Sequence, residues 1–226
     1  MKNINKLGFY SSISTVVLTL ITFGIAIFTP PLSGPYCKGV CYVYPYLDIT
    51  ARFPRDYYWM FPAILMMISY IILMICIHRW TSEEKKIYSQ IGFSFALIST
   101  TILLIDYFVQ LSVIQPSLLN GETDGILMLT QYNPHGIFIV LEELGFMLMS
   151  ISFLSMAFVF SDGKLQKAIR WTFASAFVLT AVAFIAYSAI YGLSREYRFE
   201  VASISINWLT LAVAGIFLAI LFKKNR

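Results

Sequence analysis

Charged residues are scarce in this sequence. Only 12% of its 226 residues are Asp, Glu, Lys or Arg, whereas soluble domains carry about 25%. Hydrophobic residues make up 58%, the mean hydropathy is +0.74, and several apolar runs of roughly 20 residues are long enough to cross the hydrocarbon of a bilayer. The composition excludes an ordinary soluble protein and predicts one integral membrane domain over residues 1–226.

The common sequence signatures of enzymes are also missing. The chain has no phosphate-binding loop, no GxSxG or HExxH motif and no lysine within an apolar run where retinal would attach. It has no basic stretch with interleaved aromatic residues, so nucleic acid is not an expected partner. The cofactor, the family and the oligomeric state cannot be read from the motifs, and no metal site is expected. The lipid bilayer is the one partner that the composition implies.

The apolar runs predict an all-α bundle of six transmembrane helices. The first run precedes Pro30 without a small-x-small cleavage site, which favours a retained span over a cleaved secretory signal. The expected spans are residues 8–29, 57–77, 88–113, 136–160, 169–192 and 201–222.

The distribution of Lys and Arg predicts the orientation. If the N-terminus is cytoplasmic, 11 of the 16 basic residues fall on the cytoplasmic side and five on the outer side, as expected because cytoplasmic loops carry the excess. We therefore expect both termini in the cytoplasm, and the cell (plasma) membrane as the location. The aromatic-rich segment 30–56 is then an extracellular loop that caps the bundle.

Cys37 and Cys41 lie in this loop, on the oxidising side. A disulfide between them is the favoured interpretation, and two free thiols are the alternative. A zinc site is disfavoured because neither histidine is close to them in sequence.

Three acidic residues interrupt the apolar runs. Asp106 lies in "LLIDYFVQ", and Glu142 and Glu143 lie in "VLEELG". Counted from the outer ends of their spans, Asp106 and Glu142 are both about 10 Å deep. The third and fourth spans are consecutive and antiparallel, so we expect them to be neighbours.

Helical phase suggests partners for these acids. Gln110 follows Asp106 by four residues, and His135 precedes Glu142 by seven, so each pair shares a helix face. Glu143 is turned by about 100° from Glu142. We predict that Asp106, His135 and one of the two glutamates, with Glu142 preferred, converge in an outward-facing cavity. Further binding residues expected at this level are Gln131, Asn133, Asn207, Trp208, Trp59 and Tyr187.

No Lys or Arg lies within a predicted span, and an uncompensated charge there costs at least about 2.5–3.5 kcal/mol. Three resolutions are open. The acids are protonated, or they pair with His135, Arg52 or Arg55, or they line a water-filled cavity that holds a cation.

Three functions follow from these resolutions. The first, which we favour, is binding or transport of a cation, a proton or a small amine, with Trp59, Tyr187 and Trp208 as aromatic faces for an ammonium group. The second is an enzyme that acts on a lipid-like substrate, with His135 as proton shuttle and its acid and base drawn from Asp106, Glu142 and Glu143. The third is an accessory protein in which the acids only hold helices together.

Overall fold

The computed structural model describes residues 2–225, and within that range six helices are long and apolar enough to cross a membrane. This confirms the predicted multi-pass helical membrane protein. The helices are α1 (Lys2–Ile27), α2 (Met60–Trp80), α3 (Lys86–Val109), α6 (Ile137–Ala157), α7 (Gly163–Tyr191) and α8 (Tyr197–Lys224).

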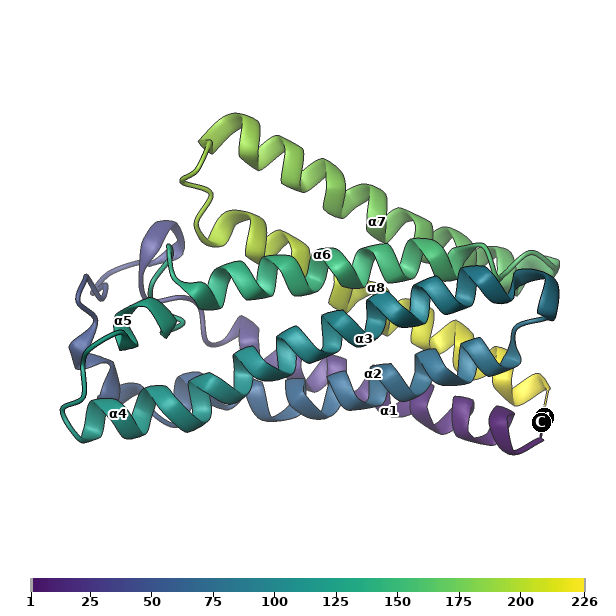
Figure 1. Cartoon of the computed structure of the whole chain (residues 1–226), viewed down its shortest axis with the longest axis horizontal. Helices are drawn as coiled ribbons and strands as arrows, with labels where there is room; N and C mark the ends of the chain where they lie inside the picture. The colour runs from purple at the N-terminus through teal and green to yellow at the C-terminus, as the bar shows by residue number, and fades with distance from the viewer. Residues whose placement is uncertain (1, 226) are drawn as a thin grey trace.

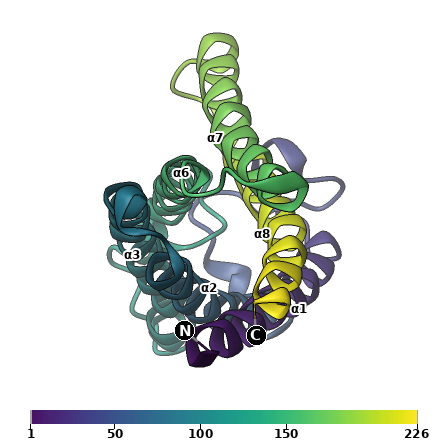
Figure 2. The same ribbon diagram turned by 90° about the vertical axis from the view of Figure 1, so that its right-hand side faces the viewer.

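Five of these helices surround a common axis. Figure 2 shows α1, α2, α3, α6 and α8 as a ring seen end-on, with α7 outside it against α6 and α8. Both termini lie at the same end (Figure 1), which we call the terminal end, and there the Asn5 side-chain amide donates to the carbonyl of Asn225. Residues 30–56 lie at the opposite end, the loop end. Which end faces the cytoplasm remains a prediction.

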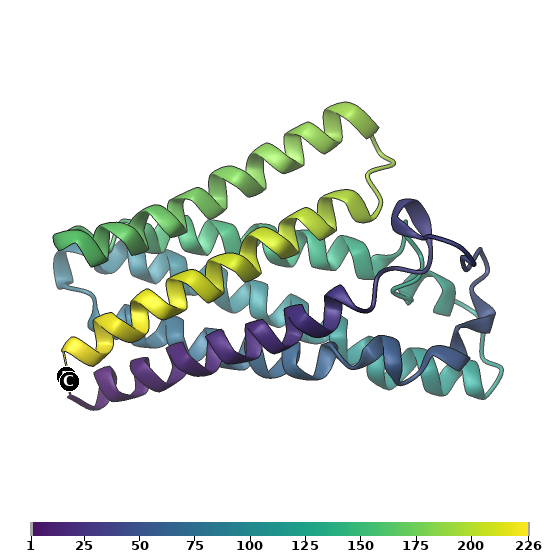
Figure 3. The ribbon, with the colours of Figure 1, turned by 180° about the vertical axis from the view of Figure 1, so that it is seen from behind.

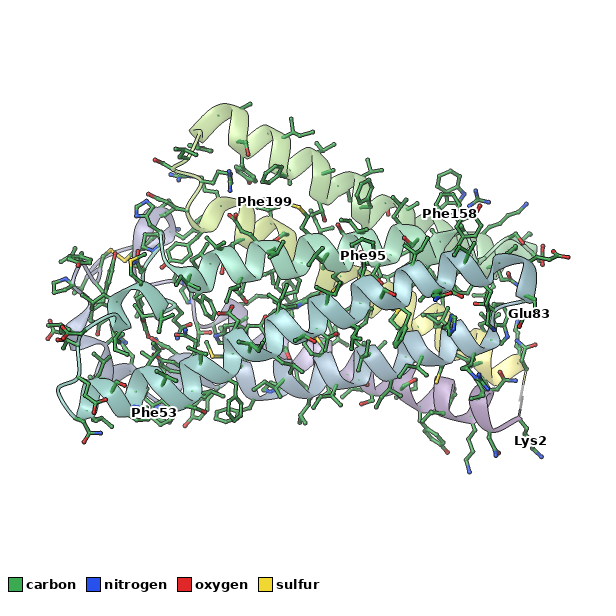
Figure 4. The ribbon with its side chains drawn as sticks, in the orientation of Figure 1. Lys2, Phe53, Glu83, Phe95, Phe158 and Phe199 are labelled. Carbon is green, nitrogen blue, oxygen red and sulfur yellow. A yellow bond between two sulfur atoms is a disulfide. The ribbon has the colours of Figure 1, made fainter. Side chains whose placement is uncertain are left out.

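The side chains mark the two ends of the bundle. Lys2 and Glu83 project at the terminal end, and Phe53 projects at the loop end (Figure 4). At the loop end, residues 30–56 form three short 3-10 turns, and Cys37 and Cys41 are joined by the predicted disulfide.

The third helix is longer than predicted. α3 continues through a π-helical turn, Gln110–Ile114, into α4 (Gln115–Leu119), so the helical path runs past the expected end at residue 113. Pro116 does not stop it, because it lies just after the π-helical turn, where the regular i→i−4 hydrogen bonds are already interrupted. Helices α1 and α7 also begin before their predicted spans, because their polar first turns are helical too.

α1 packs between α2 and α8 through a face of small and hydroxyl residues. Such residues let transmembrane backbones approach closely. A Cβ atom added to Gly215 of α8 would lie 2.5 Å from Val16 Cγ2, and Thr15 Oγ1 donates to Ser69 Oγ of α2 at 3.0 Å. The buried residues of this face are Asn5, Gly8, Ser11, Ser12, Thr15, Val16, Thr19 and Thr22.

α3 and α6 are held equally close. Ser99 Oγ donates to the carbonyl of Gly145 at 2.7 Å, and a Cβ on Gly145 would lie 2.6 Å from the Leu103 side chain. Asp106 lies about one helical turn from Leu103, and Glu142 about one turn from Gly145, both toward the loop end. The close packing therefore positions both acids in the core.

α7 is the least buried of the six helices. It packs against α6 at the terminal end and diverges from α6 toward the loop end, where a short turn joins it to α8 (Figures 1 and 3). Its buried side chains are Ile169, Phe173, Ala176 and Thr180, all in the part nearer the terminal end. Beyond them, the rings of Phe184 and Phe199 meet edge to face at 5.1 Å.

Candidate functional site

Three acidic side chains from three helices are buried in the loop-end half of the bundle. Glu142 of α6 is fully buried, and Asp106 of α3 and Glu200 of α8 are 2% and 6% exposed. α3 and α6 bring the first two together through Gly145, and Glu200 enters from the first turn of α8.

Glu142 contacts both Glu200 and one tyrosine. Tyr107 donates its hydroxyl to Glu142 Oε1 at 2.9 Å. The carboxyl groups of Glu142 and Glu200 lie close to each other, and two carboxyl groups so close are stabilised by a proton or a cation shared between them. No described residue donates to Oε2 of Glu142, Oε2 of Glu200 or Oδ2 of Asp106.

Glu142 and Glu200 line a cavity of ≈ 580 Å³ at the loop end. It lies between the loop-end parts of α1 and α8. Asp106 stays in the core beside Glu142 and does not form part of the wall. Most of the remaining wall is apolar or aromatic, contributed by Phe23, Ala26, Ile27, Pro30, Pro31, Leu32, Trp59, Phe138, Val201, Ile204 and Trp208, with Thr29, Tyr36, Lys38, Asp56, Gln131, Tyr132, Tyr197 and Ser205 as its polar members.

Aromatic rings form one side of this cavity. The Trp208 ring lies 5.8 Å from that of Phe23 and 6.2 Å from that of Trp59, measured between centroids. Trp208 Nε1 is buried and has no acceptor among the described residues. The cavity therefore combines aromatic faces, two carboxyl groups and a buried donor.

Residues from the 30–56 segment cover the cavity at the loop end. Ser33 Oγ lies 2.5 Å from the carbonyl oxygen of Tyr132 and 2.6 Å from the Tyr197 hydroxyl. Tyr197 also donates to the carbonyl of Gln131 at 3.0 Å. These bonds tie the segment both to α8 and to the loop before α6.

Asp56 anchors the same cover from the α2 side. Its Oδ1 lies 2.5 Å from Arg55 Nη2, and its Oδ2 accepts from the Tyr132 hydroxyl at 2.8 Å. Burial raises the pKa of the Tyr132 phenol, so the hydroxyl keeps the proton that it donates. Asp56 and Tyr132 were not among the predicted site residues.

The structure brings several predicted residues to the cavity or next to it. Glu142, Gln131, Trp59 and Trp208 line the wall. Asn207 is buried near them and donates from Nδ2 to the Ser203 carbonyl at 2.8 Å.

Two predicted residues brace loops instead. Gln110 donates to the carbonyl of Leu129 at 2.5 Å and accepts from the Gln131 amide at 3.0 Å. Asn133 donates to the Leu127 carbonyl at 2.9 Å. Both fix the chain between α4 and α6, which supplies Gln131 to the cavity.

His135 lies outside the acidic cluster. Its side chain is 64% exposed, and its Nε2 is 3.7 Å from Glu196 Oε1. The expected convergence assumed one continuous helix from His135 to Glu142, but α6 begins at Ile137. Pro134 and Gly136 interrupt the helix, so the helical phase of Glu142 does not extend back to His135.

Glu143 and Tyr187 also point away from the cavity. Glu143 Oε2 pairs with Arg195 Nη2 at 3.1 Å, and Tyr187 stacks on Tyr191 within α7. The two arginines expected as partners of the acids bind elsewhere: Arg52 donates to Tyr42, and Arg55 pairs with Asp56.

Glu200 is the main residue that sequence reasoning missed. It directly precedes the predicted span 201–222, whereas α8 begins at Tyr197 and includes it. A signal was present, because Glu200, Ser203 and Asn207 repeat at intervals of three and four residues on one helix face. Tyr107 and Tyr197 were missed because a tyrosine within or beside a span is ordinarily an interfacial residue.

Among residues 2–225, no group of three or more His, Cys, Asp and Glu side chains is arranged to hold a metal ion. Comparison of the chain with protein-family models, with curated proteins and with solved structures gives no match. The geometry of the cavity is therefore the basis for assigning a function.

Proposed function

We propose that this membrane protein binds a small organic amine in the loop-end cavity. The main support is that Glu142 and Glu200 both line the cavity, and that no described residue donates a hydrogen bond to Oε2 of either one. An ammonium group supplies N–H donors to these oxygens and a positive charge to the pair.

The charge balance supports a monovalent cation. Two carboxyl groups that share one proton carry a single negative charge, because like charges at hydrogen-bonding distance disfavour a second ionisation. One ammonium group neutralises that charge. Burying the pair with such a counter-ion costs far less than burying it alone.

The walls support an amine with an apolar body. Trp59 and Trp208 offer ring faces, and a cation over an aromatic ring contributes about 0.5–2 kcal/mol. The volume of ≈ 580 Å³ falls in the range of small-molecule sites, about 300–1,000 Å³. In the predicted topology the ligand would come from the extracellular side.

The test compares an amine with its neutral analogue. Purified protein is titrated with phenethylamine and with 2-phenylethanol, and binding is followed by calorimetry and by the shift in melting temperature. We expect the amine alone to bind, and to stabilise by about 2.7 kcal/mol at 100 times its Kd. Equal binding of the alcohol, or binding of neither compound, would overturn the proposal.

Variants assign the binding to the carboxyl pair. Glu142→Gln and Glu200→Gln should each remove amine binding while the protein still folds, because an amide lacks the charge but keeps the shape. Glu84→Gln, at an exposed position of the terminal end, is the matched control and should bind normally. Loss of binding in the control, or normal binding in both cavity variants, would contradict the assignment.

The same carboxyl pair supports a second candidate, an enzyme acting on a lipid-like substrate. Of two carboxyl groups that share a proton, one can donate it and the other can accept one, which is the arrangement of general acid–base catalysis. The Tyr107 hydroxyl on Glu142 would position the acceptor. Mass spectrometry of lipids incubated with wild type and with Glu142→Gln tests this candidate: products formed only by wild type would support it.

A further inference from the structure

We infer that the ligand is an amphiphilic, long-chain amine that enters the cavity sideways from the bilayer, between α1 and α8. The inference rests on the proposed amine binding and names the class of ligand and its route. Three observations support it: the shape of the cavity, the exposure of its wall residues and the depth of the carboxyl groups in the membrane.

The opening lies where two helices separate. In Figure 3, α1 and α8 lie close together at the terminal end and diverge toward the loop end. The cavity occupies this divergence. Its side chains at the opening are all half-buried or exposed, with Ile27 60% exposed; we call them the portal residues, and they are Phe23, Ala26, Ile27, Val201, Ile204 and Ser205.

The portal lies at the depth of hydrocarbon. Phe23 is four residues before the end of α1, and Ile204 is seven residues after the start of α8. At 1.5 Å per residue these positions are about 6–10 Å inside the helix ends. An opening at that level faces lipid chains rather than water.

Hydrogen bonds hold the 30–56 segment across the loop end of the cavity. Ser33 is bound to both Tyr132 and Tyr197, and the Tyr42 amide donates to the Leu32 carbonyl at 2.7 Å. The chain that leaves α1 is thus fixed over the cavity at the loop end. A segment fixed across the loop end and an apolar opening between two helices together favour entry through the portal.

The acidic and apolar residues of the site lie at the membrane depths that the headgroup and the alkyl chain of an amphiphile occupy. Glu200 lies in the first turn of α8, close to the membrane interface where an amine headgroup resides, and Ile204 lies one turn deeper. A headgroup can therefore move sideways to Glu142 and Glu200 at constant depth. Its alkyl chain then remains between Ala26 and Ile204, in contact with the bilayer.

The experiment compares chain lengths in wild type and in a portal variant. Protein in lipid nanodiscs is titrated with dodecylamine and with butylamine, and affinity is expressed per mole of lipid-partitioned amine; dodecanol controls for charge. In Ala26→Trp the indole fills the portal, so we expect dodecylamine affinity to fall at least about tenfold and butylamine affinity to stay unchanged. Val17→Trp, at an exposed position of the same helix, is the control and should bind both amines normally.

If Ala26→Trp does not fold, photo-labelling of the wild-type protein tests the same route. Dodecylamine carrying a diazirine at its chain end should label peptides of α1 and α8 around Ala26 and Ile204. Labelling confined to α3 or α7, or unchanged dodecylamine affinity in a folded Ala26→Trp protein, overturns lateral entry and leaves amine binding intact. Failure of both amines to bind wild type overturns the proposed function itself.

Discussion

Arg195 Nη2 lies 3.1 Å from Glu143 Oε2, and this ion pair joins the turn between α7 and α8 to α6. The two side chains are 23% and 11% exposed. The guanidinium also lies over the Phe184 ring, with Cζ 5.0 Å from its centroid. The pair compensates a carboxylate at membrane depth and fixes the N-terminal end of α8, and therefore the position of Glu200.

A double-mutant cycle should show that this pair stabilises the protein. Glu143→Gln and Arg195→Gln each leave the other charge without its partner, so each alone should destabilise, and the double variant by less than the sum. We expect a coupling free energy of about 0.5–3 kcal/mol, measured by SDS-induced unfolding of the purified protein. The comparison cycle uses Arg198 and Glu196, a neighbouring pair whose side chains are 24% and 22% exposed; strictly additive effects at Glu143 and Arg195 would contradict the prediction.

Close packing of α1 on α8 should be sensitive to a single methyl group. A Cβ on Gly215 would lie 2.5 Å from Val16 Cγ2, and valine has little freedom to move away. Gly215→Ala should therefore destabilise by about 1–3 kcal/mol. Gly24→Ala in α1 has no neighbouring heavy atom within 4 Å of its new Cβ among the described residues, so it should be neutral or slightly stabilising. Equal melting temperatures for the two variants would refute the contact.

The cover over the cavity should loosen when its anchor is removed. Ser33→Ala deletes the hydroxyl that lies against Tyr132 and Tyr197, a loss of about 0.5–1.5 kcal/mol per hydrogen bond. We expect faster hydrogen exchange across residues 30–56 and little change in α2 and α3. Tyr44→Phe, at an exposed position in the same segment, is the control, and a similar exchange pattern in both variants would count against an anchoring role.

The orientation can be tested by labelling single cysteines. Glu122 is exposed at the loop end and Glu83 at the terminal end. In intact cells, a membrane-impermeant maleimide should label Glu122→Cys, and it should label Glu83→Cys only after permeabilisation. The reverse pattern would place the termini outside and the cavity on the cytoplasmic side.

Much of the fold could be predicted from hydropathy. A backbone in lipid must satisfy its own hydrogen bonds, so each long apolar run is a helix. Helix ends were less predictable, because they extend beyond the hydrocarbon; the start of α8 at Tyr197 is the example that matters, since it brings Glu200 into the bundle.

The candidate site was only partly predictable. Asp106 and Glu142 were placed on neighbouring antiparallel helices from chain order and depth, and they lie on α3 and α6. The partner of Glu143 was not predictable, since Arg195 comes from a turn 52 residues away and no local spacing connects them. His135 shows the opposite failure, because the helical periodicity of Glu142 was extended past Gly136, whereas α6 begins at Ile137.

The packing of α1 has a consequence for how the protein is made. Its polar face is covered by α2 on one side and by α8, which leaves the ribosome long after α1, on the other. During synthesis, the hydroxyl groups of that face stay exposed to the bilayer, or to the translocation machinery, until α8 has inserted. A premature stop codon before residue 200 would therefore remove Glu200 and also leave α1 without α8 beside it, which predicts rapid quality-control degradation of the truncated chain rather than a partly active remnant.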